Sequence, residues 1–374
     1  MGPEGELRIA LRLQGGLVQG ADIHSTRPDV AGTMLQGRTR VEVGAVVPLL
    51  FSICGRSQAA ASALACAAAA GQMPSADDIE RHRRAVAAET VREGAWRTLL
   101  DWPQWLDEKP GDDAVAAARA SLAWLAADPA ATGEQNRAAA TAIAMAAFGM
   151  PAPDWLAIDD VAGLASWAQA GRTAAARFVC LVRDDEAAAQ AQVRSTAAVV
   201  PLLADRQHAD WVGPIAQAAA ADPDFVRHPT WHGAPAETGA LARQQSDPLL
   251  AELAARAASR PQARFVARLR ELALLLAGRA EPALGAIAVP GAGGVAWVET
   301  ARGLLIHQVA LQHGHVHRYR IVAPTEWNFH PHGALALALV GASAADAAAA
   351  RHGATRLVHS LDPCVACRVE VSDA

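Results

Sequence analysis

The sequence predicts an α+β protein with a mainly helical body and β-strands at its N- and C-terminal ends. The start of the chain alternates apolar and polar residues, the apolar ones being Leu7, Ile9, Leu11 and Leu13. This period of two is typical of a half-buried strand. Strand-like segments return at 295–323, where two apolar runs flank His313-Gly314, a pair that indicates a hairpin turn. Pro and Gly punctuate the helical patterns of the middle.

The elements follow in order along the chain. Gly15-Gly16 predicts a hairpin turn in a β-rich part that covers residues 1–50. Small residues dominate 57–70, which favours a helix packed closely against its neighbours. Further helices are expected at 75–84, 113–127, 134–149, 184–204 and 261–278. We expect a single domain over 1–374, with a helical body at 51–280 and a hairpin and C-terminal part at 281–374.

Composition and charge exclude several classes of protein. The 374 residues are 52% hydrophobic and 19% charged, so a large core can form and wholesale disorder is excluded. The net charge of −5 argues against binding nucleic acid or an anionic membrane. No apolar run reaches the ~18 residues that cross a bilayer, and the start lacks a secretory signal pattern. Five cysteines do not suggest a disulfide scaffold. We therefore expect a soluble, cytoplasmic protein.

The C-terminal segment Asp-Pro-Cys-Val-Ala-Cys places Cys364 and Cys367 three residues apart. Such a pair can bind a metal, form a redox disulfide, or do neither. A thioredoxin-like site is not expected, because the pair lies at the end of the chain rather than in a βαβ unit. Structural zinc needs four ligands, which leaves His315 and His317 as candidates for the other two. The alternative is that these histidines and His313 are simply solvent-exposed side chains of a hairpin.

A second cysteine motif, Ser-Ile-Cys-Gly-Arg-Ser, occupies residues 52–57 at an expected loop-to-helix junction. A helix N-terminus favours negative charge, so Cys54 is a candidate thiolate there. The alternative is an inert, buried cysteine. Cys66 and Cys180 match no such motif and are expected in helix cores.

Several longer motifs support a family resemblance. They are Pro-Glu-Gly-Glu-Leu-Arg-Ile at 3–9, Pro-Thr-Trp-His-Gly to Arg at 229–243, Glu-Thr-Ala-Arg-Gly at 299–303 and Ile-Val-Ala-Pro-Thr-Glu-Trp-Asn at 321–328. Together with the two cysteine motifs, and in the same order, they resemble the large subunit of nickel–iron hydrogenases. The resemblance implies the fold of that subunit.

The resemblance implies metal ligands, with departures. The enzymes bind nickel and iron through two CxxC pairs, and here Cys54 matches the first cysteine of the N-terminal pair. Its partner position is Ser57, whose hard hydroxyl is a poor substitute for a bridging thiolate. Cys364 and Cys367 match the C-terminal pair. Two family histidines are also replaced, at Ala61 and Glu370.

Other family features are retained. Arg302 matches the arginine beside the diatomic ligands of the iron, and Pro324 and Thr325 match the stretch that hydrogen-bonds the cyanides. A guanidinium and a hydroxyl suit an anionic acceptor of this kind. Glu4 matches a glutamate that relays protons. Without the resemblance, an ordinary ion pair, a capping hydroxyl and a frayed terminal residue would explain Arg302, Thr325 and Glu4.

This profile is similar to that of hydrogenase assembly proteins of the HupK/HoxV type, which are non-catalytic relatives of the large subunit. The similarity implies a scaffold for the Fe(CN)2CO unit, with iron on Cys364 and Cys367 and with Cys54 as third thiol or transfer handle. Nickel is not expected. The implied partners are maturation proteins of the HypC and HypD type and the hydrogenase large-subunit precursor. The alternatives are a divergent catalytic subunit and a metal-free docking module for maturation factors.

Overall fold

The computed structural model describes residues 5–28, 30–51, 53–126, 133–190, 211–257 and 260–373. The chain divides into two compact units. Unit 1 comprises Met1–Arg83, Gln192–Arg243 and Pro282–Ala374, and unit 2 comprises Arg84–Ala191 and Gln244–Glu281. Each unit is described by itself, and the expectation of a single domain stays a prediction.

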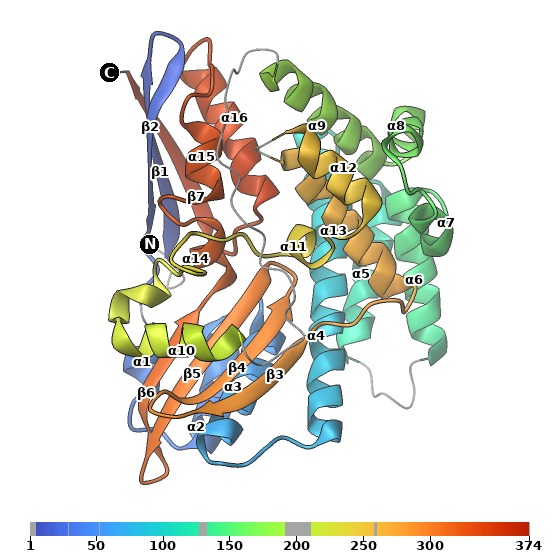
Figure 1. Ribbon diagram of the computed structural model, residues 1–374. Helices are drawn as coiled ribbons and strands as arrows, with labels where there is room; N and C mark the ends of the chain where they lie inside the picture. The colour runs from blue at the N-terminus through green and yellow to red at the C-terminus, as the bar shows by residue number, and fades with distance from the viewer. Residues whose placement is uncertain are drawn as a thin grey trace. The chain divides into compact units, whose positions relative to one another are not determined.

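The first sheet of unit 1 joins the two ends of the chain. It contains β1 (Glu6–Gln14), β2 (Leu17–Ser25) and β7 (Ala366–Asp373) in the order β2-β1-β7 (Figure 1). β1 and β2 are antiparallel, and the turn between them uses Gly15 and Gly16, both at positive φ. β7 runs parallel to β1. The predicted N-terminal strand and hairpin are confirmed.

One face of this sheet packs against two helices, α15 (Ala334–Leu339) and α16 (Ala347–Ser360). Every second residue of β1 is buried, as its alternating sequence requires. The shared apolar cluster includes Leu7, Ile9, Leu335, Leu339 and Val358. The end of α16 therefore lies close to the start of β7, and the short segment between them carries Cys364.

The second sheet of unit 1 is antiparallel, with its strands in chain order: β3 (Leu284–Val289), β4 (Gly293–Thr300), β5 (Gly303–Gln312) and β6 (His315–Val322). His313 and Gly314 form the predicted hairpin turn between β5 and β6, with φ of 50° and 81°. Helix α3 (Gly55–Ala69) packs on this sheet (Figure 1). A side chain on Gly294 would clash with the backbone of Ala65 and Ala69, so the small residues of α3 allow the close approach that the sequence predicted.

Residues 30–50 differ from the expected β-rich start. They form helices α1 (Val30–Leu35) and α2 (Arg40–Leu50). Thr39 and Glu42 make a reciprocal capping box at the start of α2, and Val43 and Val47, four residues apart, are buried. A capping box followed by i,i+4 burial specifies a helix, so the expectation of strands is correct only as far as Ser25.

The remaining elements of unit 1 are short. They are α10 (Val212–Ala221), η4 (Pro223–Val226), α11 (Ala240–Arg243) and α14 (Pro324–Asn328).

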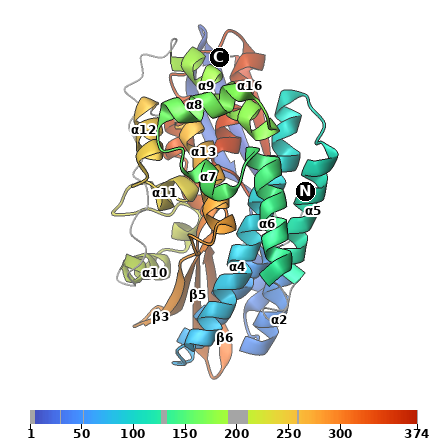
Figure 2. The same ribbon diagram turned by 90° about the vertical axis from the view of Figure 1, so that its right-hand side faces the viewer.

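Unit 2 is helical, as the middle of the sequence predicts. It contains the larger part of α4 (Ala76–Trp96), the short helices η1 (Arg97–Asp101) and η2 (Trp102–Leu106), α5 (Asp112–Ala126), α6 (Gly133–Phe148), α7 (Ala152–Leu156), α8 (Val161–Ala170), α9 (Ala174–Gln190), α12 (Pro248–Arg256) and α13 (Pro261–Leu276) (Figure 2). In its core Trp102 stacks on Phe178, and Phe265 meets both rings edge to face, with ring centroids 4.6–5.6 Å apart. Of the predicted helix 184–204, the part after residue 190 lies outside the described residues. Among the described helices, none combines the length and the apolar character that crossing a bilayer requires.

Candidate functional site

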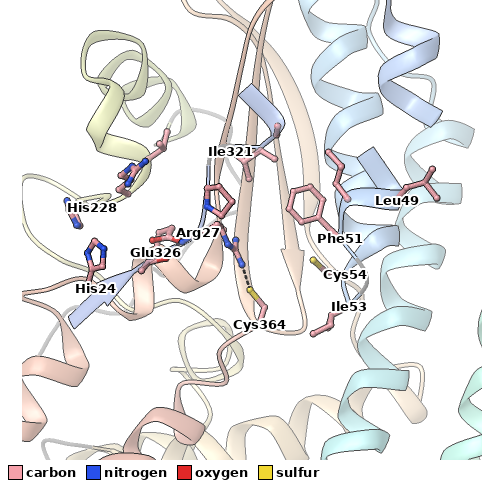
Figure 3. A pocket seen from close by; sticks show the side chains of 17 residues that line it. His24, Arg27, Leu49, Phe51, Ile53, Cys54, His228, Ile321, Glu326 and Cys364 are labelled. Atoms are coloured by element: carbon pink, nitrogen blue, oxygen red, sulfur yellow. Dashed lines mark hydrogen bonds between the residues drawn. The ribbon is translucent and has the colours of Figure 1, made fainter. Parts of the chain in front are cut away.

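Unit 1 contains a cavity of about 390 Å³ (Figure 3). One wall is formed by His24 and Ser25 at the end of β2 together with Arg27 and Pro28, and a second wall is formed by Leu49, Leu50, Phe51, Ile53 and Cys54. The end of β6, the start of α14 and residues 226–228 complete the lining together with Cys364. All of these segments belong to unit 1.

The cavity brings together two of the predicted cysteines. Cys54 occupies the N-cap position of α3, and Cys364 lies on the bend between α16 and β7. Figure 3 shows the two cysteine side chains in the same region of the cavity, each carried by a different segment. The two motifs that are farthest apart in the sequence therefore meet at one site, as the resemblance implies.

Cys364 has two polar neighbours. Arg27 Nη2 donates a hydrogen bond to Cys364 Sγ at 2.6 Å, and Thr325 Oγ1 lies 3.0 Å from the same sulfur. Thr325 is in the first turn of α14, directly after Pro324, which starts the helix and needs no N–H partner there. A charged donor and a hydroxyl thus converge on one sulfur, a pairing that suits its thiolate form.

The register of the first sheet explains how Arg27 reaches this sulfur. Leu7 pairs with Ser25 on one side and with Cys367 on the other. The residues after Ser25 and those before Cys367 therefore leave the sheet at the same level, on the two sides of β1.

Arg27 also faces Glu326, which is buried, with 8% of its surface exposed. Removal from water lowers the pKa of Arg27, but the opposite charges of Cys364 and Glu326 raise it by more, so its pKa lies above the usual value. Burial raises the pKa of Glu326, against the opposing effects of Arg27 and of a 3.3 Å hydrogen bond from Ser25 Oγ. The sequence did not predict either residue. Glu326 lies inside the recognised motif 321–328, whereas no spacing in the sequence marks Arg27.

Arg302 supports the cysteine segment rather than lining the cavity. It follows β4, is 5% exposed, and its Nε lies 3.9 Å from Asp362 Oδ2. Asp362 has a φ of 50°, a left-handed conformation that Asp tolerates better than most residues. The ion pair therefore holds the segment two residues before Cys364.

The recognised motifs converge around Arg302. Thr238 N donates to Asn328 Oδ1 at 2.9 Å, and Leu304 N donates to Thr238 Oγ1 at 2.9 Å. Asn328 Nδ2 in turn donates to the carbonyl of Arg302 at 3.5 Å. Segments 229–243, 299–303 and 321–328 thus form one buried hydrogen-bonded cluster, which explains why their motifs occur together.

Cys367 is not among the residues that line the cavity. It lies on β7 and packs against the apolar cluster of the first sheet, with Sγ 3.5 Å from the carbonyl of Val365. Within the described ranges, no group of three or more His, Cys, Asp or Glu side chains is placed to hold a metal ion. The assignment of Cys54, Cys364 and Cys367 as metal ligands stays a prediction.

Three further positions complete the comparison with the family pattern. Ser57, the degenerate ligand position, is fully buried in the first turn of α3. Ala61, one turn later, is also buried. Glu4, the predicted proton relay, lies outside the described residues.

The predictions for the remaining cysteines and for the histidine hairpin differ in their outcomes. Cys66 is buried in α3, and burial raises its pKa to about 11, so its predicted core position is confirmed. Cys180 lies on α9 but is only partly buried, so the same prediction is wrong for it. His313, His315 and His317 are exposed on the β5–β6 hairpin, which agrees with the solvated alternative.

Comparisons with known proteins give a consistent result. A family model described as nickel-dependent hydrogenase matches residues 280–370. The hydrogenase expression/formation protein HoxV of Cupriavidus necator is 33% identical, over 97% of this chain and 96% of its own length. HupK of Rhizobium leguminosarum bv. viciae, also a hydrogenase expression/formation protein, is 30% identical over 99% of this chain and 97% of its own length.

Sequence similarity to the hydrogenase enzymes covers a smaller part of this chain. The hydrogenase-2 large chain of Escherichia coli is 36% identical over 95 residues, which cover 23% of this chain and 17% of that protein. The oxidised Ni-Fe-Se hydrogenase of D. vulgaris Hildenborough aligns over 94% of both chains with a TM-score of 0.63 and 16% identity. These structures share the fold, whereas the full-length sequence likeness is to the expression/formation proteins.

Proposed function

We propose that this chain, which belongs to the HoxV and HupK family of hydrogenase expression/formation proteins, holds an Fe(CN)2CO unit as cargo for the hydrogenase large-subunit precursor. Membership of the family supports a role in hydrogenase maturation. The finer proposal depends on one observation. Cys364 and Cys54 line one cavity, and Arg27 and Thr325 lie within hydrogen-bonding distance of the Cys364 sulfur.

The chemistry of these groups suits the cargo. Thiolates are soft ligands of the kind that low-spin iron prefers. Cyanide ligands are anionic acceptors, so a guanidinium and a hydroxyl beside the sulfur can hydrogen-bond them. By comparison with the volume of water, an iron atom with three diatomic ligands occupies on the order of 100 Å³. The cavity of about 390 Å³ accommodates it.

The same geometry is compatible with release. Ser57 replaces one bridging thiolate, and Cys367 packs away from the cavity in the described conformation. Metal affinity depends on how many deprotonated ligands a site supplies. A site with two or three thiolates therefore holds its cargo less tightly than a four-thiolate enzyme site, as transfer requires. We accordingly propose a scaffold rather than a catalyst, served by maturation proteins of the HypC and HypD type.

Alanine variants test which cysteines hold the cargo. Each protein is purified without oxygen from cells that express the maturation machinery, and its iron content is measured. We expect Cys364→Ala to lose the iron. Loss with Cys54→Ala indicates a ligand pair across the cavity, whereas loss with Cys367→Ala indicates that the side chain of Cys367 turns out of its apolar contacts. Cys180→Ala, in unit 2, is the matched control, and wild-type iron in Cys364→Ala would contradict the proposal.

A second candidate is a metal-free docking module. It predicts that Cys364→Ala supports hydrogenase maturation in cells as well as the wild type does. A catalytic role would require nickel, and a Ser57→Cys variant that gained nickel and hydrogen oxidation would favour it.

A further inference from the structure

A chain of buried hydrogen bonds leads from Cys54 into the second sheet. Gln58 Nε2 donates to Cys54 Sγ at 3.6 Å, and His307 Nε2 lies 2.9 Å from Gln58 Oε1. On the other side of the ring, His307 Nδ1 lies 2.7 Å from the hydroxyl of Tyr319. Gln58, His307 and Tyr319 are at most 2% exposed, so the contacts on both sides of the His307 ring are shielded from water, whereas Cys54 is partly exposed.

The chemistry of the groups fixes the direction of each bond. An amide oxygen can only accept, so His307 Nε2 carries the hydrogen. Burial lowers the pKa of His307 to about 3, so the ring is neutral and its Nδ1 must accept. Burial also raises the pKa of Tyr319, which keeps its hydroxyl protonated as the donor. With its oxygen occupied by His307, Gln58 must direct its N–H group toward Cys54.

We infer that Gln58, His307 and Tyr319 form a positioning relay that aims an amide N–H at the sulfur of Cys54 and so orients Cys54 toward the cavity. Gln58 and Tyr319 lie outside the recognised motifs, His307 ends the Leu-Leu-Ile-His stretch that follows the motif at 299–303, and none of the three is among the residues that line the cavity. A buried polar network of this kind is costly unless every member is satisfied, and here each hydrogen bond of the chain ends on a polar group of the next residue. The role of the relay in holding cargo rests on the proposed function, but the relay itself does not.

Hydrogen bonds to metal-binding sulfurs orient the ligand and tune the metal. Loss of such an outer contact typically lowers metal affinity 10- to 100-fold. We therefore expect the relay to determine how long Cys54 retains a metal unit.

Two substitutions of Gln58 separate these roles. Gln58→Glu keeps an oxygen that accepts from His307 but has no N–H for Cys54, whereas Gln58→Met removes both contacts. The matched control is Gln308→Met. Gln308 is the next residue on β5, is equally buried, and donates to the carbonyls of Ala216 and Ala292, both at 3.0 Å.

The first measurement uses the metal-free protein. With ¹⁵N-labelled Gln and His, nuclear magnetic resonance should show the Nε2–H form of the His307 ring and a Gln58 side-chain amide signal that shifts in Cys54→Ala and in Tyr319→Phe. Gln308→Met should leave that signal unchanged. If the side-chain amide signal of Gln58 shifts neither in Cys54→Ala nor in Tyr319→Phe, the proposed relay is refuted.

The second measurement follows iron loss from protein purified with its cargo. We expect about tenfold faster loss in Gln58→Glu and Gln58→Met, and the wild-type rate in Gln308→Met. Wild-type retention in both Gln58 variants would overturn the positioning role. If the resonance shifts occur but the wild-type protein never contains iron, the relay stands and the proposed function fails.

Discussion

Replacing Arg27 by Met tests the electrostatic account of the site. The substitution keeps most of the apolar stem and removes the guanidinium that contacts Cys364 Sγ at 2.6 Å and faces the buried Glu326. A hydrogen bond with one charged partner contributes about 1.5–3 kcal/mol. Because Arg27 is half-buried, solvent screening reduces this contribution, and we expect losing the hydrogen bond to lower the free energy of unfolding by roughly 1–2 kcal/mol.

The substitution should also cause a pH-dependent loss of stability through Glu326. The pKa of Glu326 is already raised by burial, so the folded state binds its proton more tightly than the unfolded state does. Stability therefore falls as the pH rises from the ordinary pKa of Glu to the folded pKa. Without Arg27 the folded pKa rises further, with Arg227 left as a nearby cation. For each pKa unit by which the folded pKa of Glu326 rises, the free energy of unfolding at higher pH falls by about 1.4 kcal/mol.

The assay is urea denaturation of the wild type, Arg27→Met and the double variant Arg27→Met/Glu326→Gln at pH 5 and pH 8. Hydrogen exchange measured on peptides that cover 321–328 assigns the effect to unit 1. We expect Arg27→Met to be more destabilising at pH 8 than at pH 5, and the added Glu326→Gln to remove that difference. An equal loss at both pH values, or a difference that survives Glu326→Gln, would refute the reasoning.

Three further predictions concern single positions. Thr325→Val removes the hydroxyl beside the cavity cysteine and should speed iron loss about tenfold, with less than about 1.5 kcal/mol change in unfolding free energy; unchanged retention would count against its role. Gly294→Ala should destabilise the protein by about 1–3 kcal/mol or more, because helix α3 contacts that position. Its control is Gly44→Ala, where the added methyl group meets open space and should stabilise α2 by about 0.5–1 kcal/mol. Equal thermal midpoints for the two variants would contradict this packing. The pKa of Cys66 is raised to about 11, so at pH 8 iodoacetamide should modify the partly exposed Cys180 and spare Cys66, as peptide mass spectrometry can check.

The sequence predicted the parts of the site that depend on local patterns. The alternation of β1, the Gly15-Gly16 turn and the His313-Gly314 turn each follow from a few neighbouring residues, and the structure confirms them. The collinear motifs predicted that Cys54 and Cys364 meet. The parallel pairing of β7 with β1 places Cys364 beside the residues that follow β2. This long-range pairing was implied by the resemblance, and periodicity alone does not show it.

Two features of the site could not be predicted in the same way. Arg27 reaches Cys364 because Leu7 lies between Ser25 and Cys367 in the sheet, and this register has no counterpart in residue spacing. The side chain of Cys367 points to the apolar cluster because it alternates with Arg368 along β7. That alternation was present in the sequence as Cys367, Val369 and Val371, and it is the signal that could have separated Cys367 from Cys364.

The central claim is that the cavity of unit 1 holds an iron unit with diatomic ligands. Its most direct test is the infrared spectrum of the wild-type protein, purified without oxygen from cells with active maturation machinery, recorded together with its iron and nickel content. The account predicts cyanide and carbonyl stretching bands, iron, and no stoichiometric nickel. A protein that lacks both the bands and the iron, from cells in which the hydrogenase matures normally, would contradict it.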